Sequence, residues 1–82
     1  SSRLVVECPY DPYPDYSAEN SNQTNTFNKC YHESYTITAT SAWYETQTQD
    51  IEIAENKTIT LPVIYKTGNL TVTHNDATLE VV

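Results

Sequence analysis

Few side chains in this chain of 82 residues could perform catalysis. The candidates are two cysteines, Cys8 and Cys30, and two histidines, His32 and His74. A nucleophilic mechanism needs Cys or Ser activated by a neighbouring base, and no nucleophile elbow or similar motif surrounds these residues. We therefore predict that the protein is not an enzyme, with no catalytic residue and no cofactor, and that both histidines lie at the surface or at strand edges. A metal pair of His74 and Asp76 would lack a third ligand in the sequence.

An acidic loop could bind calcium. Asp11, Asp15 and Glu19 carry the carboxylate oxygens that Ca²⁺ prefers. Their spacing would align them on a helix, but Pro12 and Pro14 disfavour a helix there, and the stretch has no EF-hand spacing. We expect an ordinary solvated loop and no metal ligand, with calcium binding as the alternative.

Aromatic residues form the candidate ligand-binding surface. They lie in predicted loops or beside turns, and they are Tyr10, Tyr13, Tyr16, Tyr31, Trp43 and Tyr44. Tyrosine supplies a large contact area at low cost in conformational entropy, as in the binding loops of antibodies. The same rings could instead cover a small core, because tyrosine is half apolar. Ligand binding and packing both stay open for these residues.

Cys8 and Cys30 flank the loop at residues 9–29 and are the only cysteines. A chain this short buries only about 60–65% of its unfolded surface, so a covalent link would help to stabilise it. No CxxC or Cys/His metal spacing is present, and an even cysteine count in a secreted chain is typical of disulfide bonding. We predict a Cys8–Cys30 disulfide worth roughly 3 kcal/mol, with two buried free thiols as the alternative.

The net charge is −7, from four Lys and Arg against eleven Asp and Glu. This balance argues against nucleic acid and against anionic membrane surfaces as partners. No apolar run approaches the ~20 residues that span a bilayer, so we expect no membrane insertion by this chain. Because it begins at Ser1 without methionine, we expect a processed mature chain or an excised domain.

Three N-x-[ST] acceptors indicate possible N-glycosylation, at Asn22, Asn56 and Asn69. Asn22 and Asn56 fall in predicted loops or turns, where a glycan could be accommodated. Together with the predicted disulfide, these acceptors favour an extracellular or cell-surface location.

Alternation of Thr with aliphatic residues dominates 34–63, which reads SYTITATSAWYETQTQDIEIAENKTITLPV. A period of two is typical of half-buried antiparallel strands, and no window has helical periodicity. We expect strands at 3–8, 34–41, 46–53, 57–66, 70–73 and 77–82, with Pro62 marking an edge or a bulge. Six or seven short strands predict a single domain, 1–82, with an all-β, Ig-like or transthyretin-like antiparallel β-sandwich fold.

The stretch 34–63 also resembles PEGA and carboxypeptidase-regulatory-like domains. The resemblance rests on YTITA at 35–39, YET at 44–46, IEI at 51–53 and NKT at 56–58, before Leu61. The family usually has glycine where this chain has Trp43. Its members are small Ig-like or transthyretin-like sandwiches of microbial surface proteins, so the resemblance implies a non-catalytic module that spaces, displays or links other parts.

The C-terminal residues 69–82 have two interpretations. They could close their own sandwich as a hairpin, or they could lend a strand to a neighbouring subunit, because an added strand satisfies an open sheet edge. We predict a subunit or repeat of a microbial cell-surface fibre or surface protein, with self-association or neighbouring domains of the same protein as partners. The alternative is an adhesion module that binds a glycan or a host protein through the tyrosine loop at 9–29.

Overall fold

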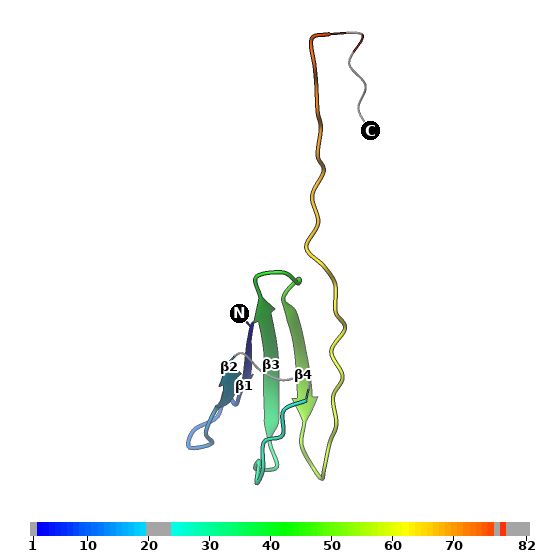
Figure 1. Cartoon of the computed structure of the whole chain (residues 1–82). Helices are drawn as coiled ribbons and strands as arrows, with labels where there is room; N and C mark the ends of the chain where they lie inside the picture. Colours follow the sequence, from blue (N-terminus) through cyan, green and yellow to red (C-terminus); the bar gives the residue numbers. More distant parts are fainter. Residues whose placement is uncertain (1, 20–23, 77, 79–82) are drawn as a thin grey trace.

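The fold is all-β, with one antiparallel four-stranded sheet (Figure 1). The computed structural model describes residues 2–19, 24–76 and 78. The strands are β1 (Ser2–Glu7), β2 (Tyr16–Glu19), β3 (Ser34–Ser41) and β4 (Gln47–Glu52), in the spatial order β2-β1-β3-β4. In the described ranges there is no helix long and apolar enough to cross a membrane.

Alternation along each strand gives the sheet one apolar and one polar face. In the ladder, Val6 of β1 lies opposite both Tyr16 of β2 and Ile37 of β3. Tyr35 of β3 lies opposite Ile51 of β4. The threonines of β3 alternate with these residues and point to the other face. The predicted period of two is therefore confirmed for β3 and β4.

The core is small and lies on the apolar face. Its buried members are Val6, Tyr35 and Ile37. Partly buried apolar residues pack against them, namely Leu4, Cys8, Tyr16, Phe27, Ile51, Ile53, Ile59 and Leu61. Phe27, Ile59 and Leu61 come from segments without strand structure. In the described part of the chain, extended segments therefore cover this face in place of a second sheet.

The predicted number of strands is wrong: the described residues form four strands, whereas the sequence predicted six or seven. Residues 57–66 contribute a single bridge, between Tyr65 and Tyr44, and no ladder. Pro62 cannot donate a ladder hydrogen bond, and Ile59 and Leu61 pack on the core face. Residues 70–73 form no strand, and residues 77–82, apart from Thr78, lie outside the described residues.

Strand β2 was missed because it lies in the segment predicted as loop 9–29. Its residues Tyr16 and Ala18 are partly buried, whereas Ser17 and Glu19 are exposed. The pairing with β1 places Glu19 opposite Arg3, and their side chains form an ion pair of 3.5 Å. Sequence composition obscured this strand, because the prolines just before it favour a loop.

The predicted disulfide is wrong for this structure, which has Cys8 and Cys30 as free thiols. Cys8 packs against the core cluster. The Cys30 thiol donates a hydrogen bond to the Phe27 carbonyl oxygen, 3.5 Å away. Both thiols lie close enough to Tyr35 to raise its pKa, yet no covalent link joins them, and the core and the sheet hold the loop.

The molecule is long and thin because its C-terminal part leaves the sheet (Figure 1). Its principal extents are 67 × 22 × 18 Å, and its radius of gyration is 20.1 Å. A compact chain of this length would have a radius of gyration of about 12 Å. After β4 the chain turns back along the sheet, passes the loop between β3 and β4, and continues beyond it. We call residues 67–76 of this extension the tail.

Candidate functional site

The sequence-predicted aromatic residues lie at two opposite ends of the sheet. The ladder pairs Glu7 with Thr36 at one end and Ser2 with Ser41 at the other. The loop that follows β1 is therefore far from the loop that follows β3 (Figure 1). Tyr10, Tyr13 and Tyr31 belong to the first end, and Trp43 and Tyr44 to the second. The structure does not bring the six predicted residues into one site.

At the first end, Tyr13 and Tyr31 stack with ring centroids 5.3 Å apart. Tyr10 is 54% exposed and Tyr31 is 55% exposed, so part of this aromatic surface is open to solvent. Tyr16 is different. Its ring lies 5.8 Å from that of Phe27 and 6.3 Å from that of Tyr35, and burial, followed by the nearby Cys30, raises its pKa. Tyr16 is thus a packing residue.

Tyr35 connects the core to this aromatic end. Its side chain is almost completely buried, and its hydroxyl donates a hydrogen bond of 3.1 Å to the Tyr31 carbonyl oxygen. Burial, followed by the neighbouring Tyr16 and the two cysteines, raises the pKa of Tyr35 to about 12. The buried, neutral phenol of Tyr35 therefore holds the backbone in place at Tyr31.

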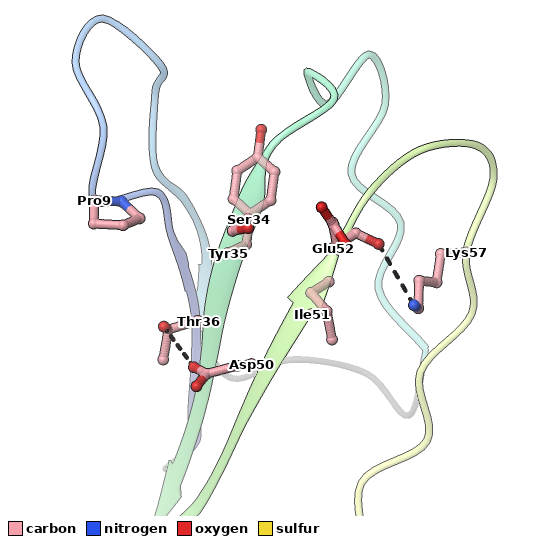
Figure 2. A pocket seen from close by; sticks show the side chains of 8 residues that line it. All are labelled: Pro9, Ser34, Tyr35, Thr36, Asp50, Ile51, Glu52 and Lys57. Carbon is pink, nitrogen blue, oxygen red and sulfur yellow. Dashed lines mark hydrogen bonds between the residues drawn. The ribbon is translucent and has the colours of Figure 1, made fainter.

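A depression of about 510 Å³ opens at the same end of β3 and β4 (Figure 2). Its lining residues are Pro9, Ser34, Tyr35, Thr36, Asp50, Ile51, Glu52 and Lys57. Thr36 Oγ1 donates to Asp50 Oδ1 at 2.8 Å, and Lys57 Nζ donates to the Glu52 carbonyl oxygen at 3.4 Å. Thr36, Asp50 and Lys57 are thus each engaged in a hydrogen bond at this depression, and we assign no reaction to it.

The acidic loop serves the structure of the chain. Asp15 Oδ1 accepts a hydrogen bond of 2.9 Å from the Cys8 amide and so joins the two sides of the loop. Glu19 pairs with Arg3. Across the described ranges, no group of three His, Cys, Asp or Glu residues is placed to hold a metal ion. His32 and His74 are both exposed.

Two of the predicted glycosylation acceptors, Asn56 and Asn69, are exposed. Asn56 follows the bend after β4, and Asn69 lies in the tail. The third acceptor, Asn22, lies outside the described residues. Modification of any of them stays a prediction.

The second end of the sheet anchors the tail. The Glu45 amide donates to the Ile64 carbonyl oxygen at 2.7 Å, and the Lys66 amide donates to the Trp43 carbonyl oxygen at 3.0 Å. Tyr44 and Tyr65 stack across this bridge with ring centroids 4.9 Å apart. Sequence reasoning missed Tyr65 as a partner of Tyr44, although the strand predicted at 57–66 contained the signal.

The tail itself has no partner among the described residues. Residues 67–75 make no hydrogen bond, ion pair or ring contact there. Leu70 is 88% exposed and Val72 is 60% exposed. Among the described residues, Asp76 bonds only Thr78, two residues along the chain. Its Oδ1 accepts from the Thr78 hydroxyl and amide, which lowers the Asp76 pKa. An extended segment thus presents two apolar side chains to solvent.

Charge is distributed unevenly between the sheet and this extension. Residues 1–55 carry nine Asp or Glu and only two Lys or Arg. Residues 56–75 carry two lysines and no acidic residue. The part that contains the sheet is therefore strongly acidic, whereas the two lysines of the extension both precede the tail, whose only Asp or Glu is Asp76.

Comparisons with known proteins add no assignment: no protein-family model matches the chain, and neither a curated protein nor a solved structure is significantly similar to it.

Proposed function

We propose that the protein is a non-catalytic, extracellular structural module that assembles by strand addition, as a subunit or repeat of a microbial cell-surface fibre. The tail is the observation that supports this proposal. Leu70 and Val72, two residues apart on an extended chain, project on one side of it and are exposed. Single exposed apolar residues are ordinary on protein surfaces, but an extended apolar pair on a segment without main-chain partners is typical of a strand that completes another sheet.

The length of the tail fits this role. The ten residues of the tail, if fully extended, span about 33 Å, and the eight residues of β3 span about 26 Å, at roughly 3.3 Å per residue. The tail can therefore run along the full length of a neighbouring sheet. Both edge strands, β2 and β4, have outer sides that make no backbone ladder with another described residue, so each offers main-chain groups to an added strand.

The tail carries little charge of its own, because it has no Lys or Arg and only Asp76 as an acidic residue. It can therefore lie along the acidic sheet region of a second copy with less charge repulsion than two sheet regions would meet. An added strand beside β2 or β4 would extend the single sheet from four strands to five.

Electron microscopy and sedimentation velocity over a concentration series of the full chain test the proposal. We expect regular filaments or ladders for the native protein, and a monomer of 9.3 kDa for the Leu70→Ser/Val72→Ser double variant. The matched control is Thr71→Ser/Thr73→Ser, which changes the other side of the same tail and should assemble normally. A native chain that stays monomeric at every concentration, or a double variant that assembles as well as the native chain, would overturn strand addition.

The second candidate is a glycan- or protein-binding adhesion module at the first end of the sheet. The observation in its favour is the stacked pair of Tyr13 and Tyr31 next to the exposed Tyr10. Binding to a glycan array should then be lost in Tyr10→Ser and in Tyr31→Ser and be kept in Trp43→Ser, which changes the opposite end. Equal binding by all of these variants, or none by the native chain, would reject this candidate.

A further inference from the structure

The two edges of the sheet differ in how far the chain itself covers them. Residues 57–66 run back along the outer side of β4, although they form no ladder with it (Figure 1). At one end of β4, Lys57 Nζ donates to the Glu52 carbonyl oxygen. Just before the other end, the Glu45 amide donates to the Ile64 carbonyl oxygen. The segment therefore contacts the β4 edge at both ends and lies in the path of an added strand.

Apolar packing keeps this segment beside β4. Ile59 and Leu61 pack against the core cluster, so moving the segment aside would expose both side chains to water. Pro62 lies next to them and has no amide hydrogen with which to extend a sheet. Covering segments and proline are means by which natural proteins block a sheet edge. The β4 edge is therefore closed to a strand from another molecule.

The other edge, β2, is open in the described part of the chain. Its backbone pairs with β1 on one side only. No backbone hydrogen bond joins Tyr16–Glu19 to a described residue on the outer side. The outward main-chain groups of β2 are thus available to a strand that is added there.

Side-chain alternation on β2 also matches that of the tail. Tyr16 and Ala18 lie on the apolar face and are partly buried. A strand beside β2 can place Leu70 and Val72 next to them, because residues two apart share a face. Thr71 then joins the polar face, where the threonines of β3 already lie. The added strand would therefore continue both faces of the sheet.

The same match is missing at β4. The residues of β4 on the apolar face are Gln47, Gln49 and Ile51, which pair with Ala39, Ile37 and Tyr35 of β3. Two of these three side chains are amides. Leu70 and Val72 would gain less apolar contact there than beside Tyr16 and Ala18.

We propose that the outer edge of β2 in a second copy is the acceptor for the tail. This inference rests on strand addition as the proposed function and assigns it to one edge. The donor leaves its sheet beside β4, whereas the acceptor is the opposite edge (Figure 1). Donor and acceptor are therefore different surfaces of one chain, and such a heterologous contact can repeat from copy to copy as a filament.

A synthetic peptide of residues 67–76 tests the acceptor directly. It is added to the full-length Leu70→Ser/Val72→Ser variant, whose own tail should not compete, and amide hydrogen exchange is followed residue by residue by NMR. We expect exchange of β2 amides to slow by about tenfold or more, with β4 amides at unchanged rates. The matched control is the same peptide with serine at both apolar positions, which should protect neither strand.

Charge substitutions at the two edges give a second test in the full chain. Ala18→Lys places an ammonium group beside the expected Leu70 and Val72 contacts, because inward-pointing charges block edge pairing. It should raise the concentration for half-assembly by about tenfold or more. Gln49→Lys, on the same face of β4, is the matched control and should assemble at the native concentration. Circular dichroism checks that both variants keep the sheet, and the peptide experiment does not depend on either of them.

The outcomes separate this inference from strand addition itself. Protection of β4 in place of β2, or native-like assembly by Ala18→Lys, would overturn the β2 acceptor and leave strand addition standing. Equal loss of assembly in both charge variants would also overturn it. Protection of β2 by the peptide, in a native chain that never assembles, would assign the tail to its own copy and overturn the second copy as acceptor. The absence of both assembly and peptide protection would overturn both proposals.

Discussion

Tyr44 and Tyr65 face each other across an isolated antiparallel bridge, with ring centroids 4.9 Å apart and ring planes inclined by 60°. The neighbouring Tyr65 hydroxyl, followed by the charge interaction between the two phenols, raises the pKa of Tyr44. Beyond this pair and the hydrogen bonds of Lys66, residues 67–75 make no hydrogen bond, ion pair or ring contact in the described part of the chain. The next such contact is at Asp76. The pair therefore determines where, and in which direction, the tail leaves the sheet.

Tyr65→Ala should loosen the root of the tail without unfolding the sheet. An aromatic pair contributes about 0.5–1.5 kcal/mol beyond its buried area, so we expect hydrogen exchange of the Glu45 and Lys66 amides to accelerate about two- to tenfold. Amides of β1 and β3 should exchange at native rates. Tyr65→Phe keeps the ring and is the control. Equal acceleration in β3 would show that the bridge supports the whole sheet and would contradict this local role.

Ile37→Ala should destabilise the entire fold. Ile37 is one of three buried residues in the described part of the chain, and it packs where β1 and β3 pair. Removing such a side chain from a core costs about 2–5 kcal/mol, which is a large part of the stability of a chain this small. Urea unfolding followed by circular dichroism measures the loss. Thr38→Ala, the next residue on the polar face, should change the free energy of unfolding by much less, and similar losses in both variants would argue against a core on this face.

The parts of the fold that the sequence predicts well are those with clear local patterns. Alternation at 34–41 coincides with β3, and the strand expected at 46–53 differs from β4 by one residue at each end. In both cases half of the side chains face a core, so the period of two follows directly from burial. Strand β1 was likewise located by its alternating apolar residues.

The remaining parts depend on contacts that sequence alone does not contain. Strand β2 is four residues long and gains its stability from pairing with β1, which local propensity cannot show. Residues 57–66 have strand composition, yet Ile59 and Leu61 turn to the core face and only Tyr65 forms a bridge. The expected disulfide is also wrong, because Cys8 and Cys30 are free thiols although both lie near Tyr35. Of the aromatic candidates, Tyr10, Tyr31 and Trp43 are exposed and Tyr16 packs against the core, and strand register divides the set between two ends of the sheet.

Tyr35 should make the fold sensitive to alkaline pH. Its folded pKa of about 12 lies above the unfolded value of about 10. Its neutral form is favoured in the folded state, so this contribution is fully present below pH about 10 and is lost as pH rises to about 12. Urea unfolding at a series of alkaline pH values should show the free energy of unfolding falling across this window, while tyrosinate absorbance shows one late-titrating phenol.

Tyr35→Phe separates this effect from the other tyrosines. The variant loses the hydrogen bond to the Tyr31 carbonyl oxygen, so at neutral pH its free energy of unfolding should fall by about 1 kcal/mol. Phenylalanine does not ionise, so the fall across the alkaline window should become smaller. An unchanged pH dependence in this variant would assign the sensitivity to another group.

The tail should be the first part of the native chain to be cut by a protease. Residues 67–75 are exposed and lack hydrogen-bond partners in the described ranges, and such segments can enter a protease site without prior unfolding. Thermolysin cleaves before large apolar residues, so brief digestion of dilute monomer should cut before Leu70 and Val72, while the sheet residues stay intact by mass spectrometry. Digestion of assembled protein should spare the same bonds, because an added strand is paired on the acceptor. Cleavage at equal rates in both states would place the tail outside the assembly contact, whereas early cleavage within β3 would contradict the stability of the sheet itself.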